Sequence, residues 1–524
     1  MDLGYVHFDR PGASNVISEV LTLSEIADAV FRNKYVNLSE KTATNPNGKT
    51  FIGRVVEGPF FIPEEVGRDS AIAQAPILRG DTVPIIPKYY ALNRVEILGE
   101  YDGTRLLPSR TRPRPKSKVS ELDLRAIHNI TGSAGDLLLG KLEGYNEVNI
   151  SIDSTDKKIL PRNFGIFGTV GSGKSNTAQV LIEEALKQKY AVVLFDVEGE
   201  YVNMDKPTNE LTDLLKAYGL NPSGVKDFEV LYPAPGEKPR ADAHPFCVSF
   251  DTFDMFILFE LVHATEAQER SFSVLVDEIE REKAGRKETK KGPLAREREK
   301  SEPYTLSRAI QKIYALIDDD RMNKISGYAL SGKLAYINRF GIFDAKGVDE
   351  LNAEQLVQPG KLTVIDVSSC SDHVKNIAIV DVLKKVFDKK LEDPKAARTL
   401  IVIEEAHTFI SREARDKMEA TVDMLKIIAR RGRKRWLCLC FVSQQPAHIP
   451  TEIFELCNSR IIHTTKSEPN INALKSTTGG VVSEVWNIVP ILGQGQALVT
   501  TPQFTHPLIV NIRPAASQRK FVEY

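Results

Sequence analysis

The 524-residue sequence has no long apolar run. None approaches the ~18 residues that a membrane-spanning helix requires. The N-terminus, MDLGYVH, has neither the basic stretch nor the apolar stretch of a secretory leader. We therefore expect a soluble protein that is neither inserted into a membrane nor exported.

Cysteine is scarce. The five cysteines, at positions 247, 370, 438, 440 and 457, form no C-x-x-C pair, and Cys438 and Cys440 lie inside an apolar, strand-like run. This pattern is typical of reduced, buried thiols, so we expect a cytoplasmic protein.

Neither sign of charge dominates, since 69 Lys and Arg residues face 70 Asp and Glu residues, for a net charge of −1. The chain as a whole carries no positive field, so any contact with nucleic acid must rest on local basic patches. Internal repeats and extended low-complexity tracts are also missing. At about 150 residues per domain, the length predicts two or three domains.

Two kinds of pattern divide the chain. Residues 1–150 alternate short β-rich runs with Gly, Pro and Asn, which predicts a small barrel or sandwich. Within them, residues 108–118 (PSRTRPRPKSK) form a basic, proline-broken stretch, either a solvated connector or a nucleic-acid contact. Residues 151–244 and 349–513 alternate strands with helices, which predicts an α/β core with a mostly parallel sheet.

Residues 245–348 carry helical patterns and predict an all-helical subdomain inserted into this core. Its segment 278–300 mixes both signs of charge, which favours a solvated helical surface. A short tail, residues 514–524, completes the chain.

The run GTVGSGKS, from Gly168 to Ser175, matches the phosphate-binding pattern G-x-x-x-x-G-K-[ST]. A strand pattern precedes it and a helix pattern follows, as this loop requires. Backbone N–H groups and the helix N-terminus would hold the phosphates, Lys174 would reach the β- and γ-phosphates, and Ser175 would bind Mg²⁺. The residues expected to contact ATP are Gly168, Gly171, Ser172, Gly173, Lys174, Ser175 and Asn176.

Two adjacent carboxylates, Glu404 and Glu405, end the β-branched run LIVI. Such a pair suits a nucleotide hydrolase: Glu404 would bind Mg²⁺ through water, and Glu405 would act as the general base. His407 is either a link to the γ-phosphate or a structural, hydrogen-bonded histidine.

Polar residues follow two further strand patterns. Asp196 ends one run and is expected to orient the attacking water or the metal shell, whereas Glu198 and Glu200 fit a functional role and a turn equally well. Gln444 ends another run and is the candidate sensor of the γ-phosphate.

A basic cluster, residues 430–435 (RRGRKR), ends a helix pattern. One interpretation is that its charges complement the C-terminus of the helix. The other is that it contains an arginine finger for the ATP of a neighbouring subunit.

Together, these motifs resemble the HerA family, within the HerA/FtsK group of hexameric DNA-translocating ATPases. The resemblance covers residues 1 to about 513 and rests on the segments GTVGSGKSNT, FDVEGEY, LIVIEEAH, IARRGRK and VSQQP. It implies a RecA-like core, an N-terminal HAS-type barrel, a helical subdomain, and a homohexameric ring around double-stranded DNA.

The resemblance also implies roles for single residues. It makes Asp196 and Glu405 hydrolytic residues, Gln444 the sensor and Arg430 the finger acting in trans, with Arg162 as a second arginine at the nucleotide. The sequence departs from the family pattern at Asn163, where His is frequent, at Arg431, where an acidic residue is frequent, and at Gln445, where a basic residue is frequent. These departures bear on coupling between subunits, and no DNA-gripping residue is assigned.

Two functions are compatible with this resemblance. The first is an ATP-driven DNA translocase or helicase that supplies duplex to a partner nuclease such as NurA. The second is a scaffold ring that regulates an antiviral effector, either a nuclease or a sirtuin-type NAD-consuming enzyme. In both, we expect the partner to bind the N-terminal barrel and ATP with Mg²⁺ to occupy the core. A conjugation or chromosome-pumping ATPase is disfavoured, because its usual membrane segment is missing.

Overall fold

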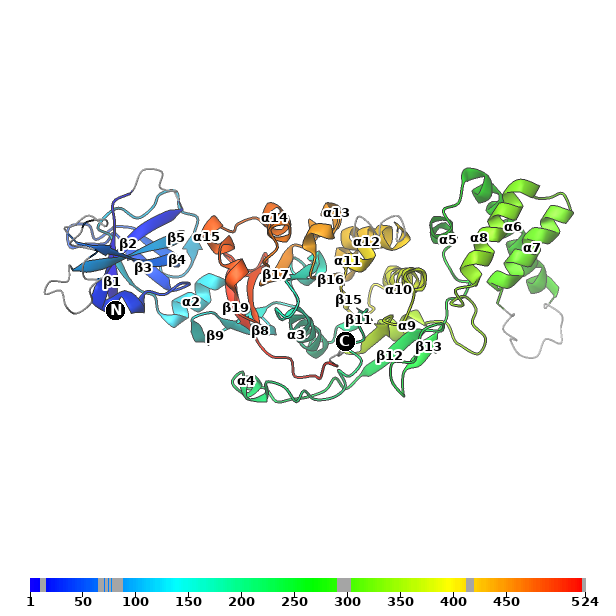
Figure 1. Cartoon of the computed structure of the whole chain (residues 1–524), viewed down its shortest axis with the longest axis horizontal. Helices are drawn as coiled ribbons and strands as arrows, with labels where there is room; N and C mark the ends of the chain where they lie inside the picture. Colours follow the sequence, from blue (N-terminus) through cyan, green and yellow to red (C-terminus); the bar gives the residue numbers. More distant parts are fainter. Residues whose placement is uncertain are drawn as a thin grey trace. The chain divides into compact units, whose positions relative to one another are not determined.

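The computed structural model describes residues 1–9, 16–64, 70, 74, 77, 88–289, 303–410 and 419–520, which form two compact units (Figure 1). Unit 1 contains residues 1–153, 461–467 and 478–513, and unit 2 contains residues 154–460, 468–477 and 514–524. Segments 461–467 and 478–513, which the sequence patterns placed with the ATPase core, thus cluster with the N-terminal residues. Their contacts are distant in sequence, so local patterns did not reveal them.

Unit 1 begins with a barrel. Its strands follow the order β2-β1-β7-β3-β4-β5-β6, and a further pairing of β2 with β5 closes six of them into a ring. Closure leaves no unpaired edge among these six strands, and it confirms the predicted barrel. The strands are β1 (Asp2–Val6), β2 (Ile17–Leu23), β3 (Tyr35–Ser39), β4 (Thr50–Pro63), β5 (Tyr89–Tyr101), β6 (Leu106–Leu107) and β7 (Lys118–Glu121).

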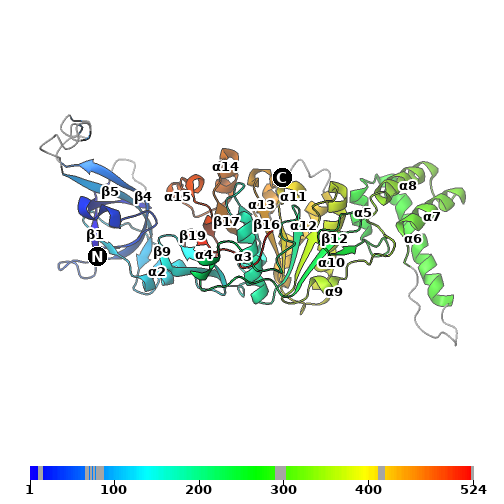
Figure 2. The same cartoon turned by 60° about the horizontal axis from the view of Figure 1, so that its bottom comes forward.

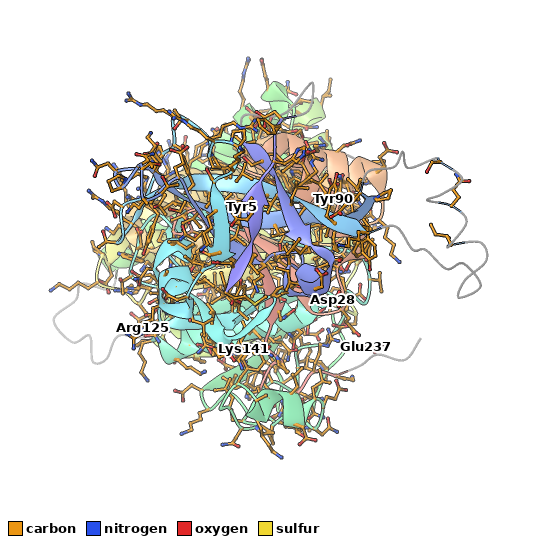
Figure 3. All side chains as sticks on the ribbon, turned by 90° about the vertical axis from the view of Figure 1, so that its left-hand side faces the viewer. Tyr5, Asp28, Tyr90, Arg125, Lys141 and Glu237 are labelled. Atoms are coloured by element: carbon orange, nitrogen blue, oxygen red, sulfur yellow. The ribbon has the colours of Figure 1, made fainter. Side chains whose placement is uncertain are left out.

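Alternating apolar side chains fill the barrel. Val36, Leu38 and Phe51 are almost fully buried, and each such side chain contributes about 1.5–3 kcal/mol. Tyr5 on β1 is exposed and Tyr90 on β5 is partly exposed, and both are labelled in Figure 3. The basic stretch 108–118 runs irregularly between β6 and β7, up to the first residue of β7.

The rest of unit 1 includes the short helices α2 and α15 and an antiparallel sheet in the order β18-β19-β8-β9. Asp123 caps α2 by accepting a hydrogen bond from the Ala126 amide at 2.8 Å. The buried Tyr35 hydroxyl lies 2.6 Å from His506 Nε2, which links the barrel to the loop before β19. The elements are α2 (Leu124–Thr131), β8 (Leu137–Leu142), β9 (Tyr145–Ile152), α15 (Ser483–Trp486), β18 (Gln496–Thr500) and β19 (Leu508–Ile512).

Unit 2 is built on a parallel sheet in the order β13-β12-β14-β11-β15-β16-β10. The four strands β11, β14, β15 and β16 are buried along their whole length, as expected for a sheet covered on both faces. The predicted α/β core with a mostly parallel sheet is therefore confirmed. The strands are β10 (Phe164–Phe167), β11 (Ala191–Asp196), β12 (Phe228–Pro233), β13 (His244–Phe246), β14 (Leu362–Asp366), β15 (Thr399–Ile403) and β16 (Leu437–Ser443), and β17 (Ser459–His463) leads from unit 2 into unit 1.

Helices pack on this sheet. Helix α3 contacts β10, β11 and β16, while α12 contacts β16 and α10 (Figure 1). All five cysteines are free, and four of them are buried, as the sequence predicts; Cys370 is partly exposed. The core helices are α3 (Lys174–Lys187), α4 (Thr212–Lys216), α9 (Ala353–Leu356), α10 (Asp372–Glu392), α11 (His407–Ile410), α12 (Glu419–Arg431), α13 (Thr451–Phe454) and α14 (Glu468–Thr477).

The inserted region is helical, as predicted. Figures 1 and 2 show α6, α7 and α8 side by side. Glu278 and Glu282 of the charged segment both pair with Lys312, at 3.2 and 2.8 Å, and residues 290–300 of that segment lie outside the described residues. The helices are α5 (Met255–Leu261), α6 (Glu266–Thr289), α7 (Leu306–Asp318) and α8 (Lys324–Asn338).

Candidate nucleotide-binding site

The carboxyl ends of four parallel strands meet at one edge of the unit 2 sheet. Phe167 at the end of β10 is level with Ser443 on β16, and Ile403 at the end of β15 is level with Phe195 on β11. The loops that follow these strands therefore gather at one edge, where ligands of parallel sheets bind. Strand β16, which leads to Gln444, separates the phosphate-loop strand from the strand that leads to Glu404 and Glu405.

The loop from Gly168 to Gly173 has the backbone of a phosphate cradle. Gly171 and Gly173 adopt φ values of 73° and 112°, in a region that favours glycine. Lys174, the first residue of α3, is 7% exposed and donates from Nζ to the Thr169 carbonyl at 3.1 Å. The helix N-terminus and a buried ammonium group thus lie together, which suits a polyphosphate.

The negative charges of Glu404 and Glu405 act on Lys174. Burial lowers the pKa of Lys174, and the charges of Glu405, Glu404 and Glu200 oppose that shift. Burial raises the pKa of Glu404 well above its usual value, with the nearby charges of Asp196, Glu200 and Glu405 adding to the effect. Negatively charged side chains therefore outnumber positively charged ones around Lys174 and Glu404.

Two further features fit a hydrated magnesium ion. Within the part of the chain that the structure describes, no donor forms a hydrogen bond to the buried Glu404 Oε2, so a metal-bound water would satisfy it. Glu405 has φ of 42°, a strained value for a residue with a side chain, and such strain is held at functional sites. When bound, magnesium would supply charge neutralisation between the phosphates, and Ser175 with Glu404 would hold it.

Asp196 is completely buried, and its carboxylate caps a turn. Oδ1 accepts from the amides of Gly199 and Glu200 at 2.8 and 3.2 Å, and Oδ2 accepts from the Tyr201 amide at 2.8 Å. Burial, followed by the charge of Asp366, raises the pKa of Asp196 to about 7. The structure therefore gives this residue a positioning task in the turn 199–201.

Gln444 and His407 lie just past the carboxyl ends of β16 and β15, respectively. Gln444 is partly exposed and directly follows β16. His407 Nδ1 lies 3.1 Å from Glu405 Oε2 and 3.3 Å from the Ser443 hydroxyl. His407 thus connects Glu405 to the end of β16.

The two predicted arginines lie at the opposite edge of the sheet. Arg162 precedes β10, and the exposed Arg430 precedes β16, so both lie at the amino ends of their strands. Across the seven residues of β16, this edge is roughly 20 Å from the phosphate loop. Neither arginine therefore joins the phosphate loop of its own chain. Arg430 lines a cavity of about 480 Å³ with Phe387, Leu391, Arg431, Lys434 and Arg435.

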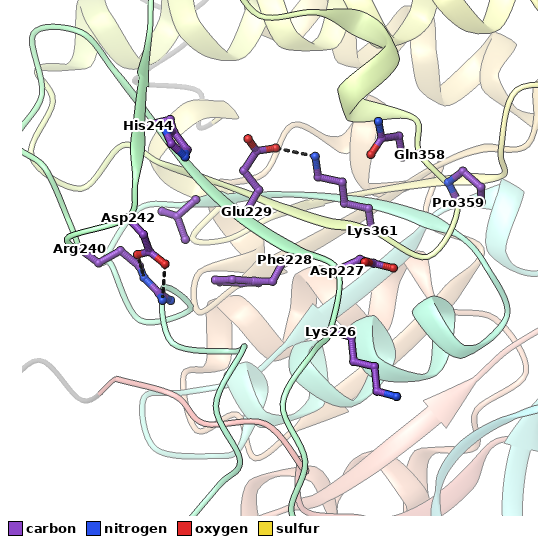
Figure 4. Close-up of a pocket in the computed structure, with 11 residues that line it drawn as sticks. Lys226, Asp227, Phe228, Glu229, Arg240, Asp242, His244, Gln358, Pro359 and Lys361 are labelled. Atoms are coloured by element: carbon purple, nitrogen blue, oxygen red, sulfur yellow. Dashed lines mark hydrogen bonds and ion pairs between the residues drawn. The ribbon is translucent and has the colours of Figure 1, made fainter.

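Another cavity, of about 710 Å³, lies at the amino ends of β12 and β14 (Figure 4). Its charged groups pair with one another: Lys361 with Glu229 at 2.6 Å, and Arg240 with Asp242 at 2.5 Å. These ion pairs already engage the Lys361 and Arg240 cations, which leaves neither of them for a phosphate.

Sequence patterns missed three contributors to the site. The buried Tyr201 interacts electrostatically with Glu404, Glu200 and Asp196. The charge of Asp366 acts on Asp196, and the charge of Arg519 acts on Lys174. Asn176, predicted as a nucleotide contact, uses Oδ1 to accept a hydrogen bond from the Ala515 amide at 2.9 Å. No local motif marks Arg519 or Ala515, because their partners lie more than 300 residues earlier.

The model of the family described as "Helicase HerA, central domain" matches residues 137–386. The probable DNA double-strand break repair helicase HerA of Methanocaldococcus jannaschii is 24% identical over 458 residues, 80% of this chain and 85% of that protein. The chain is thus similar to HerA helicases over most of its length. The DNA double-strand break repair helicase HerA of Pyrococcus furiosus is 23% identical, over 80% of this chain and 76% of that protein.

Solved structures similar to this chain include VirB4 of Thermoanaerobacter pseudethanolicus, with a TM-score of 0.47, 16% identity, and coverage of 73% of this chain and 97% of that chain. The plasmid coupling protein TrwB, solved with a non-hydrolysable GTP analogue, has a TM-score of 0.47, 13% identity, and coverage of 75% and 92%. Within the described part of the chain, every helix is too short or too polar to span a membrane.

Proposed function

We propose that the protein is an ATPase that translocates on double-stranded DNA as a homohexamer. The observation that carries the proposal is the buried Lys174 beside Glu404 and Glu405 at the carboxyl edge of the sheet. A cation for the phosphates and acidic groups for magnesium and water are the parts that ATP hydrolysis requires.

The residues of this edge take separate roles. Lys174 binds the β- and γ-phosphates, and the amides of Gly168, Gly171, Ser172 and Gly173 line the phosphate path. Glu405 accepts a proton from the attacking water, and Gln444 responds to the γ-phosphate. Asp196 acts through the turn that it caps, by fixing Glu200 beside Glu404.

The two distant arginines support the proposed hexamer. Because Arg430 and Arg162 lie roughly 20 Å from the phosphate loop of their own chain, a role at a nucleotide requires a neighbouring subunit. A heterologous contact between identical chains forms a ring when its rotation closes, and we propose a closed ring of six. We propose Arg430 as the trans finger and Arg162 as a supporting contact.

The proposed DNA substrate rests on similarity to HerA helicases. Relatives carry the names of DNA double-strand break repair helicases, which supports duplex DNA as the substrate. We further propose a nuclease partner of the NurA kind and a cytoplasmic location. The barrel exposes apolar side chains, including Tyr5, Phe8 and Leu23, which are 57–64% exposed. Such residues suit protein contact, so we assign partner binding to the barrel.

The test is ATP hydrolysis by the full chain, with and without duplex DNA. We expect DNA to stimulate the wild type. Glu405→Gln should lower kcat by about 10²–10⁴-fold, as for loss of a general base, and Arg430→Ala by about 10³–10⁵-fold, as for loss of a finger.

Mixing the two variants tests the shared site. In a random mixture, about one interface in four combines an intact Glu405 with an intact Arg430, so activity should partly return. No recovery on mixing would contradict a finger in trans. Hydrolysis that ignores DNA would contradict the translocase and favour a scaffold ring that regulates a defence effector.

A further inference from the structure

The C-terminal segment Pro514–Lys520, here called the C-terminal strap, lies along α3, the helix that begins with Lys174 (Figure 1). Glu183 on α3 holds it with one oxygen: Oε1 accepts from the Ala516 amide, the Ser517 amide and the Ser517 hydroxyl, each at 2.8 Å. Asn176, the third residue of the same helix, accepts a hydrogen bond at Oδ1 from the Ala515 amide at 2.9 Å. Three hydrogen bonds to one carboxylate oxygen make this a firm attachment.

The loop after β11 holds the other side of the strap. The Thr208 and Ser223 amides both donate to the Ala516 carbonyl at 2.9 Å, and the Gln518 amide donates to the Lys206 carbonyl at 2.8 Å. Ala516 and Ser517 are consequently 9% and 2% exposed. Ala516, Ser517 and Gln518 are fixed between α3 and this loop, so Arg519 directly after them has a defined position.

The strap ends at the acidic side of the nucleotide site. Arg519 Nη1 lies 3.3 Å from Glu200 Oε2, and the Lys520 amide donates to the Glu200 carbonyl at 2.8 Å. Glu200 lies in the turn capped by Asp196, and the charges of Glu200 and Arg519 both act on Lys174. The strap therefore places a second cation at the edge where the phosphate loop lies.

We propose that Arg519 is a nucleotide-binding residue that acts in cis. When ATP binds, Arg519 releases Glu200 and pairs with the phosphate tail of ATP instead. The inference rests on the proposed function of the same site. In the Arg519–Glu200 pair the two side chains are 23% and 25% exposed, so solvent reaches the pair and it can open. A polyphosphate carries more negative charge than one carboxylate, and a guanidinium binds phosphate with two parallel hydrogen bonds.

A purely structural ion pair gives a different expectation. If Arg519 only fastens the strap, then removing either partner of the pair should weaken nucleotide binding in the same direction. If Glu200 and ATP compete for Arg519, the two removals should act in opposite directions. The difference in sign separates the two accounts.

The experiment is calorimetric titration of the full chain with magnesium and the non-hydrolysable analogue AMP-PNP. Arg519→Ala should weaken binding about 10- to 100-fold, the range for losing hydrogen bonds to a charged group. Arg519→Lys, which keeps the charge, should recover part of this loss. Glu200→Gln should tighten binding about 3- to 10-fold, and the double variant should match Arg519→Ala.

Lys174→Ala is the control for the proposed function itself. If it leaves AMP-PNP binding unchanged, the nucleotide site is wrong, whatever Arg519 does. If Lys174→Ala abolishes binding while Arg519→Ala leaves it unchanged, only the role of Arg519 is refuted. An equal gain from Glu200→Gln with and without Arg519 would also refute it, because the gain would then come from Glu200 alone.

Discussion

Asp196→Asn separates a structural role of this residue from direct participation in hydrolysis. Asparagine keeps one acceptor oxygen, which can still serve the Gly199 and Glu200 amides. The Tyr201 amide, now bound to Oδ2 at 2.8 Å, would face an NH₂ group and lose its acceptor. Leaving a buried donor unsatisfied costs about 1–3 kcal/mol, so we expect the free energy of unfolding to fall by about that amount.

Trp436 lies in unit 2 and Trp486 in unit 1. Urea unfolding followed by Trp436 fluorescence in a Trp486→Phe background therefore reports on the unit that contains Asp196. We expect kcat at saturating ATP to fall by less than about tenfold, since Asp196 acts only through its turn.

Asp366→Asn is the matched control for this prediction. Asp366 is the register partner of Asp196 on β14 and accepts only from Ser368 among the hydrogen bonds described for it, so this variant removes a neighbouring charge and leaves the three amide hydrogen bonds to Asp196 in place. An Asp196→Asn protein that unfolds like the wild type but loses about 10³-fold in kcat would refute the positioning role and indicate direct participation.

Three further predictions concern the rest of the fold. Burial, and next the charge of Arg54, lowers the pKa of His506 well below 6.5. Below pH 6.5 the unfolded chain therefore binds one more proton than the folded chain, and the free energy of unfolding, followed by Trp486 fluorescence, should fall by up to about 1.4 kcal/mol per pH unit. The slope should be weaker in His506→Gln. Glu183→Ala removes the acceptor of the strap, so amide exchange at Ser517 should accelerate at least about tenfold; unchanged exchange would show that the loop alone holds the strap. Burial raises the pKa of Cys457 to about 12, so this thiol should resist Ellman's reagent at pH 8 until urea is added. Rapid labelling of Cys457 itself in the native protein would contradict its burial.

The sequence predicted those parts of the fold that depend on contacts between residues close in the chain. The phosphate loop, the strand before Glu404 and Glu405, and the helical insertion follow from periodicity and short motifs, because hydrogen bonds within a strand–loop–helix unit join residues that are close in sequence. The barrel was predictable as a class from its short strands and turn residues, and its closure by β2 and β5 required the structure.

Contacts between distant residues were not predictable. The three amides on Asp196 depend on how the turn 199–201 folds back, and the Arg519–Glu200 pair joins residues on different elements. The clustering of residues 478–513 with the barrel unit has the same origin. Pattern reasoning reports which residues share a face of one element, whereas these contacts depend on the tertiary fold.

Displacement of a third strand from triplex DNA tests the central claim most directly, because it requires ATP-driven movement along a duplex. With magnesium and ATP, the wild-type protein should displace the strand, and neither Glu405→Gln nor wild type with AMP-PNP should do so. A wild-type protein that hydrolyses ATP in the presence of this duplex and leaves the third strand in place would contradict translocation.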